Sequence, residues 1–172
     1  MNIYQQIEKR IYSECLIIDK VVNRALLAWT EAGKHPDAQS LYLDSVALNL
    51  HGFYTGVERL FELVARHIDG SVPSDKNWHK NLLKQMSNNY KNFRPAIISQ
   101  SIFLEMDEFR RFRHVVRNVY TTSLAPDRMK TIMNNLSATW KQLKDELHAF
   151  AEFLENQISE ANSGPNTVNT TT

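Results

Sequence analysis

The sequence predicts an all-α protein, an antiparallel bundle of four to five helices. Long segments repeat apolar residues at helical spacing, and turn formers are scarce, with five Gly and five Pro in 172 residues. The composition, 42% hydrophobic and 23% charged, is typical of a globular protein, and the length suits one domain with a sizeable core. We therefore expect a single domain over residues 1–161 and a disordered polar tail over 162–172.

The first half of the chain predicts two long helices. Residues 3–32 return apolar side chains to one side, and Gly33 followed by His35-Pro36 is a stop signal. Residues 37–69 form the second predicted helix, with Gly52 and Gly56 one turn apart inside it. Each glycine costs up to ~1 kcal/mol against alanine, so this spacing favours the close approach of a neighbouring helix.

The second half predicts one short helix and two long ones. The turn-forming stretch DGSVP (69–73) precedes a short amphipathic helix over 77–89, and a connector over 90–95 leads to a helix over 96–121. Pro126 suits a first helical turn, so the last helix is expected over 127–160.

Charge and cysteine usage limit the function classes. The net charge is +1, so an anionic partner must be argued from local clustering rather than from the whole chain. Cys15 is the only cysteine, which excludes an intramolecular disulfide and a Cys-based metal site. No apolar run approaches the ~18–20 residues of a membrane span, and no signal peptide is recognisable, so we expect a cytoplasmic protein without membrane attachment.

The segment FRRFRHVVRNVY (109–120) is the candidate site. On a helix its apolar residues fall on one side: Phe109, Phe112, Val115, Val116 and Val119. Its polar residues fall on the other: Arg110, Arg113, His114, Arg117, Asn118 and Tyr120. Like charges three or four residues apart repel, and an anionic partner would relieve that repulsion.

Two interpretations of this basic face are open. Its arginines could be solvated or paired with acids on the first and last helices. They could instead line a groove for phosphate, with RNA favoured because its 2′-OH supplies an internal nucleophile and no metal is needed. The six histidines are scattered and no phosphate loop, HExxH or GxSxG motif occurs, so neither a metal nor a cofactor is expected.

The neighbouring residues also suggest roles for Glu58 and for Trp78-His79. Glu58 is either a surface charge or a partly buried partner for an arginine of the basic helix. Trp78-His79 opens the short helix and is interpreted as an aromatic anchor to the core with a nearby imidazole.

Residues 113–120 resemble the Arg-x4-His-x-Tyr motif of HEPN-domain ribonucleases, in particular HepT-like toxins of prokaryotic toxin–antitoxin systems. The segments YTGVERLFELVARHIDGSVP (54–73) and WHKNLLKQM (78–86) are also similar to HepT-like proteins. The similarity covers roughly residues 40–150, most of the chain.

The resemblance implies a HEPN bundle that forms a homodimer, with two motifs meeting in a shared cleft. There an mRNA or tRNA would be cut without metal, leaving a 2′,3′-cyclic phosphate. The implied partner is a minimal nucleotidyltransferase (MNT) antitoxin of a type VII-like system, which transfers AMP to the motif tyrosine, here Tyr120. Arg113 would hold the phosphate, with Arg110 and Arg117 lining the groove.

The motif departs from the family at one position, where Asn118 replaces the histidine. A carboxamide cannot take up a proton at neutral pH, and losing one acid/base group costs about 10²–10⁴ in rate, so we expect impaired cleavage. Asn118 could be an engineered inactivation, or mark a natural, non-catalytic protein that binds RNA, nucleotide or the nucleotidyltransferase. Alternatively, His114 could supply the imidazole, which gives Arg113, Asn118 and His114 as the candidate catalytic set.

Overall fold

The computed structural model describes residues 2–118 and 126–162. Its helices are α1 (Ile3–Lys34), the short 3₁₀ helix η1 (Pro36–Ala38), α2 (Gln39–His67), α3 (Trp78–Ser87), α4 (Gln100–Asn118) and α5 (Pro126–Asn162). Within these ranges no strand forms, and the one β-bridge pairs Tyr90 with Arg94. The all-α prediction is confirmed. Asn162, predicted to begin the polar tail, is instead the last residue of α5, and the rest of the predicted tail, 163–172, lies outside the described residues.

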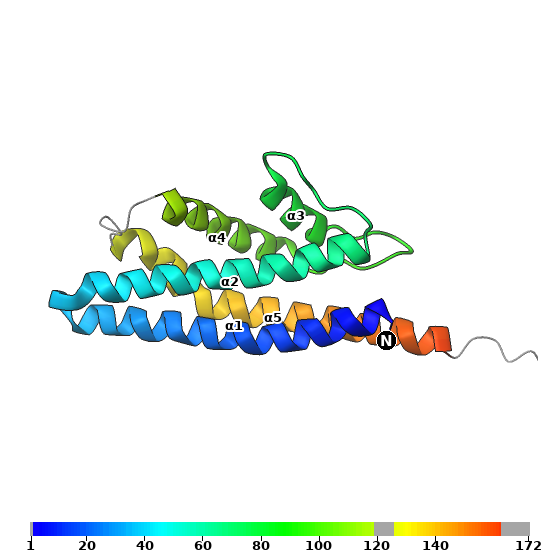
Figure 1. Ribbon diagram of the computed structural model, residues 1–172, viewed down its shortest axis with the longest axis horizontal. Coiled ribbons are helices and arrows are strands. Elements are labelled where there is room, and N and C mark those ends of the chain that lie inside the picture. Colours follow the sequence, from blue (N-terminus) through cyan, green and yellow to red (C-terminus); the bar gives the residue numbers. More distant parts are fainter. Residues whose placement is uncertain (1, 119–125, 163–172) are drawn as a thin grey trace, which may run out of the picture.

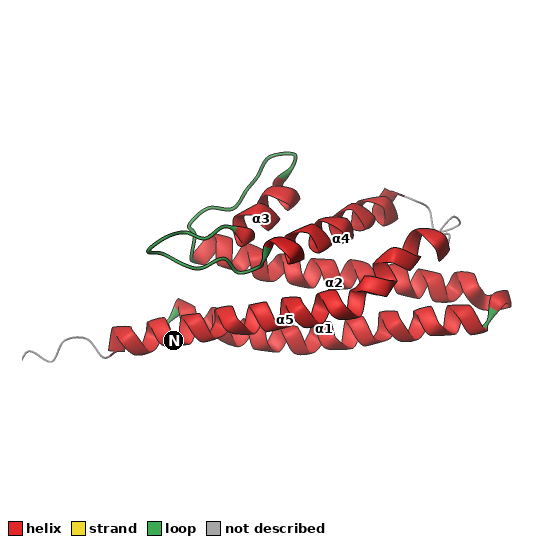
Figure 2. Cartoon of the chain, turned by 180° about the vertical axis from the view of Figure 1, so that it is seen from behind, coloured by secondary structure: helices red, strands yellow, loops and turns green. Residues whose placement is uncertain are grey.

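Three long helices lie side by side, and two shorter ones cover α2 (Figures 1 and 2). The helix α1 packs against both α2 and α5, and it runs antiparallel to them. The helices α4 and α3 lie on the side of α2 that faces away from α1, and α3 contacts both α2 and α4. This arrangement brings side chains of α2, α3 and α4 to one place.

The two helix-interior glycines of α2 face α1, and one of them is a point of close approach. A Cβ at position 56 would lie 3.1 Å from Cγ1 of Ile18, whereas one at position 52 would lie 3.6 Å from Val21, an ordinary contact. The predicted close approach is therefore confirmed at Gly56. The absence of a side chain there lets α1 and α2 pack along their length.

Aromatic and polar contacts fix α5 in the bundle. Phe53 of α2 packs edge-on against Phe109 of α4 and Trp140 of α5, with ring centroids 5.0 and 5.9 Å away. Trp140 Nε1 and Lys144 Nζ donate to the carboxylate of Asp19 on α1, over 2.7 and 2.6 Å. These contacts hold α1, α2, α4 and α5 around one core.

The helix α4 begins at Gln100, four residues later than predicted. The Ser99 hydroxyl accepts a hydrogen bond from the Ile102 amide (3.3 Å), as a helix-capping side chain does. The Ser99 amide donates to Glu146 of α5 (2.9 Å). Ile97 and Ile98 are buried ahead of the helix, and their amides reach the Met86 carbonyl, so apolar residues that suggested helix belong to the connector.

No helix in the described part of the chain combines the length and apolar character that a membrane span requires.

Candidate active site

The described part of the apolar side of α4 is placed as predicted, while the Val115 side chain and Val119 lie outside the described residues. The first arginines of the helix, however, are already paired. Phe109 and Phe112 are buried. Arg110 Nε donates to Asp107 (2.7 Å), while Arg111 donates to Asp107 (2.8 Å) and to Glu108 (3.0 Å). The acids that pair with these arginines are therefore on α4 itself, rather than on the first and last helices.

Asp107 offsets much of the repulsion predicted along this helix. Its carboxyl is buried, and burial alone would raise its pKa. The hydrogen bonds and positive charge of Arg110 and Arg111 outweigh that effect, so the pKa of Asp107 lies below its ordinary value. Two of the cations of α4 are thus held near a permanent carboxylate, which reduces their attraction for a second anion.

Arg113 differs from these two arginines. It forms no ion pair with a carboxylate within residues 2–118 and 126–162, and its buried Nε has no hydrogen-bond partner there. Its guanidinium carbon lies 5.7 Å from the ring centroid of Tyr54 on α2. Its Nη1 lies 3.5 Å from Nε2 of His79 on α3, at the long limit of a hydrogen bond. The motif arginine is therefore directed at the junction of α2 and α3.

His79 is held at that junction by a buried carboxylate. Its Nδ1 is hydrogen bonded to Oε2 of Glu58, whose side chain is only 6% exposed, whereas the His79 side chain is 22% exposed. The imidazole also stacks on Trp78, with centroids 3.6 Å apart and an interplanar angle of 27°. The ring is fixed on one edge by Glu58 and on one face by Trp78, which leaves its Nε2 edge toward Arg113.

Tyr54 completes this cluster on α2. It is buried, and its hydroxyl is hydrogen bonded to Glu58. Burial, followed by the charge of Glu58 and that hydrogen bond, raises the pKa of Tyr54 far above its ordinary value. The phenol therefore stays protonated and can donate to Glu58, whose carboxylate also accepts from His79.

The structure corrects two interpretations made from sequence. Glu58 is buried as one reading had it, but it holds His79 instead of pairing directly with an arginine. His79 is more than a neighbour of an aromatic anchor, because it lies between Glu58 and Arg113. Sequence reasoning missed this role since His79 is 21 residues from Glu58 and 34 from Arg113, with no local pattern joining them.

The remaining predicted site residues are placed only in part. His114 lies on the exposed side of α4. The side chains of Arg117 and Asn118 and the whole of Tyr120 lie outside the described residues, so their predicted roles stay predictions.

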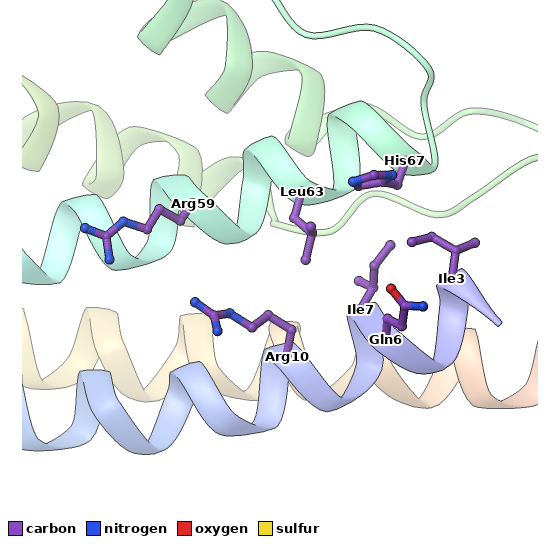
Figure 3. A pocket seen from close by; sticks show the side chains of 7 residues that line it. All are labelled: Ile3, Gln6, Ile7, Arg10, Arg59, Leu63 and His67. Atoms are coloured by element: carbon purple, nitrogen blue, oxygen red, sulfur yellow. The ribbon is translucent and has the colours of Figure 1, made fainter. Parts of the chain in front are cut away.

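A separate cavity of about 410 Å³ lies on the other side of α2, between its C-terminal end and the N-terminal end of α1 (Figure 3). It is lined by Ile3, Gln6, Ile7, Arg10, Arg59, Leu63 and His67. Glu58 faces α3 while the adjacent Arg59 lines this cavity, so the two features occupy different sides of one helix. Within the described ranges, no three His, Cys, Asp or Glu side chains gather as a metal site would require.

The fold and the site together define the class of the protein. It is a HEPN-like all-α bundle in which a basic helix places an arginine beside a carboxylate-held imidazole. Residues 45–154 match the family described as HepT-like protein, and the chain belongs to that family. The match agrees with the span of roughly 40–150 expected from sequence. The chain has no significant match among curated proteins or solved structures.

Proposed function

We propose that this HepT-like protein is the toxin component of a type VII-like toxin–antitoxin system, an endoribonuclease that cuts RNA without a metal ion. Family membership supports the reaction class. The observation that carries the proposal is the state of Arg113, the first residue of the motif. Arg110 and Arg111 are paired with acids, but Arg113 has no carboxylate partner within the described residues and lies next to an imidazole. A guanidinium in that state is available to bind a phosphodiester.

The chemistry follows from the substrate as much as from the protein. In RNA the 2′-OH is adjacent to the phosphorus, so attack within one nucleotide needs no enzymatic nucleophile. Arg113 would neutralise the charge that develops on the phosphate oxygens, and a neighbouring group would move the proton. The products are a 2′,3′-cyclic phosphate and a free 5′-OH.

The assembly is part of the proposal. Two protomers would bring their motifs together in one cleft, where Arg117 extends the phosphate groove and Arg110 contributes less because it is paired with Asp107. An MNT nucleotidyltransferase would act as antitoxin by transferring AMP to Tyr120. AMP at this position, two residues beyond Asn118, would place a bulky anion beside the arginines that bind RNA.

Asn118 favours a second function, binding without cleavage. Asn118 stands where the motif has histidine, and a carboxamide accepts and donates hydrogen bonds without transferring protons. A protein with this change alone would bind RNA, a nucleotide or the nucleotidyltransferase without cutting. The two functions make opposite predictions for the purified chain.

The deciding experiment measures cleavage of a labelled RNA in EDTA by the chain with Asn118 and by its Asn118→His variant. The ribonuclease function predicts cleavage with a cyclic phosphate at the new 3′ end, about 10²–10⁴-fold faster in the His form. A substrate with 2′-deoxyribose at the cut position should resist both proteins. If both are folded and bind RNA but neither cuts, the binding function replaces the nuclease.

A further inference from the structure

We propose that His79, held by Glu58, is the general base that removes the proton from the 2′-OH. This inference rests on the proposed ribonuclease function and adds the residue that performs its proton transfer. It gives the catalytic imidazole to α3, outside the Arg-x4-His-x-Tyr segment. Glu58 is then a positioning residue, because it acts on substrate only through His79.

The hydrogen bond to Glu58 selects the protonation form that a base needs. A carboxylate accepts only, so the Nδ1 that faces Glu58 carries the hydrogen and Nε2 carries the lone pair. The negative charge of Glu58 also stabilises the imidazolium that forms when Nε2 takes up a proton. Tyr54 donates to the same carboxylate and keeps it in place.

The lone pair is directed to where a bound phosphate would lie. In the free protein Nη1 of Arg113 is 3.5 Å from Nε2, a distance at which the interaction is weak. A phosphate oxygen would bind this guanidinium more strongly and draw its N–H away from Nε2. For proton transfer, the 2′-OH of the nucleotide before that phosphate would have to lie about 2.6–3.2 Å from Nε2.

The site is open enough for substrate and rigid enough for catalysis. The His79 side chain is part exposed while Glu58 beneath it is buried, so RNA would approach the Nε2 edge and leave the Glu58 contact covered. Stacking on Trp78 restricts rotation of the ring. Among the described residues, the charged groups that contact the imidazole are Glu58 from α2 and Arg113 from α4, and Tyr54 acts on it through Glu58.

The step balances without any further reactant except water. The 2′-OH proton moves to Nε2 of His79, the 2′-oxygen forms a bond to phosphorus, and the bond from phosphorus to the 5′-oxygen breaks. The departing 5′-oxygen takes a proton from water, and the imidazolium later returns its proton to water. An imidazole from α3 therefore acts as the base, whereas Asn118 cannot act as an acid toward the departing oxygen, a role that a histidine at this position would take.

The test compares His79→Ala with the unsubstituted chain at saturating RNA, in EDTA. The variant should cleave about 10²–10⁴-fold more slowly with unchanged RNA affinity, because only proton transfer is removed. Free imidazole added to the variant should restore part of the rate, whereas it should leave the rate of the unsubstituted chain unchanged. A purely structural role of His79 would not produce such rescue. His35→Ala, at the turn between α1 and α2, is the control with no expected effect.

Two further measurements distinguish the role of His79 as general base from the role of Glu58 as positioning residue. The dependence of the cleavage rate on pH that a general base produces in the unsubstituted chain should be lost in His79→Ala. Glu58→Gln should lower the rate without imidazole rescue, since the ring is still present but lacks its carboxylate.

The possible outcomes distinguish the role of His79 as general base from the proposed ribonuclease function on which it rests. If the unsubstituted chain cuts RNA and His79→Ala cuts equally well, the ribonuclease function stands and His79 is not its base. Loss of cleavage in His114→Ala instead would move the role to α4. If only Asn118→His cuts, the ribonuclease function stands and His79 fails as a sufficient base. If neither form cuts although both bind RNA, both proposals fall.

Discussion

Arg94 and Asp69 form a buried, bidentate ion pair between the two connectors that flank α3. Arg94 Nε lies 2.5 Å from one carboxylate oxygen and Nη2 lies 2.6 Å from the other. The remaining guanidinium N–H groups donate to the carbonyls of Gln85, Asn88 and Pro95. Asp69 follows α2 and Arg94 follows α3, so this pair closes the loop that carries His79 to Glu58.

Replacing Arg94 should therefore be among the most damaging single changes in the chain. Arg94→Ala leaves the Asp69 carboxylate buried without a cation, which costs about 3–5 kcal/mol of unfolding free energy. Urea denaturation followed by circular dichroism measures it. Lys34→Ala, which breaks an exposed pair with Glu31, is the matched control and should cost less than about 1 kcal/mol. Equal effects for the two variants would contradict a structural role for the buried pair.

The two glycines of α2 should respond to alanine with opposite signs. Gly52→Ala adds a Cβ at ordinary contact distance from Val21, so the gain in helix propensity should stabilise the fold by about 0.5–1 kcal/mol. Gly56→Ala places a Cβ 3.1 Å from Ile18, and overpacking of this kind costs about 1–3 kcal/mol, more than the propensity gain. Thermal unfolding of both variants measures the difference.

A double variant tests the cause at Gly56. Ile18→Ala removes the atoms that the new Cβ would meet, so Gly56→Ala should cost less in that background than in the natural protein. Additive effects would show that the cost does not come from contact with Ile18.

Asp19 should give the fold part of its dependence on pH. Burial acts to raise the pKa of Asp19, but hydrogen bonds from Lys144 and Trp140 outweigh it and lower the pKa below its ordinary value of 3.8. A lowered pKa means stability that is complete above the ordinary value and is lost as pH falls through the folded value. Asp19→Asn should therefore cost about 1–3 kcal/mol at pH 7, and the gap to the natural protein should narrow below about pH 4. A gap that stays constant down to low pH would contradict this assignment.

RNA binding should weaken with salt, and Arg113 should contribute more than its paired neighbour. Each phosphate contact releases counterions, so Arg113→Ala should reduce the slope of log affinity against log salt by about one. Arg111→Ala should change it less, because that guanidinium is held between Asp107 and Glu108. Fluorescence anisotropy with a labelled RNA at two or more salt concentrations gives both slopes. An affinity that barely changes with salt would exclude a phosphate groove.

Local periodicity was sufficient to predict all five α-helices. The first was expected over 3–32 and spans Ile3–Lys34, and the last was expected over 127–160 and spans Pro126–Asn162. The buried side of the basic helix was also predicted, since Phe109 and Phe112 follow from the helical repeat alone. The start of α4 was wrong because Ser99 and Glu146 interact across 47 residues, which no local pattern records.

The family and its motif were determined by the sequence itself. The segment from Arg113 to Tyr120 and its upstream flanks indicated a HepT-like protein, and the match over residues 45–154 confirmed it. Such motifs can be read along the chain because their spacing follows one helix. The same reading exposed Asn118 as the departure from the family pattern.

Only the tertiary structure decided which side chains meet. Glu58, His79 and Arg113 come from three different helices. His79 is 21 residues from Glu58 and 34 residues from Arg113, the two residues that it contacts. Likewise, Asp69 and Arg94 meet only because the chain leaves α2, forms α3 and returns. Helical spacing fixes the direction of a side chain about its own axis, but the packing of one helix on another selects its partner. The pairing state of each arginine, and with it the site proposed for RNA, therefore depends on how α3 and α4 pack on α2.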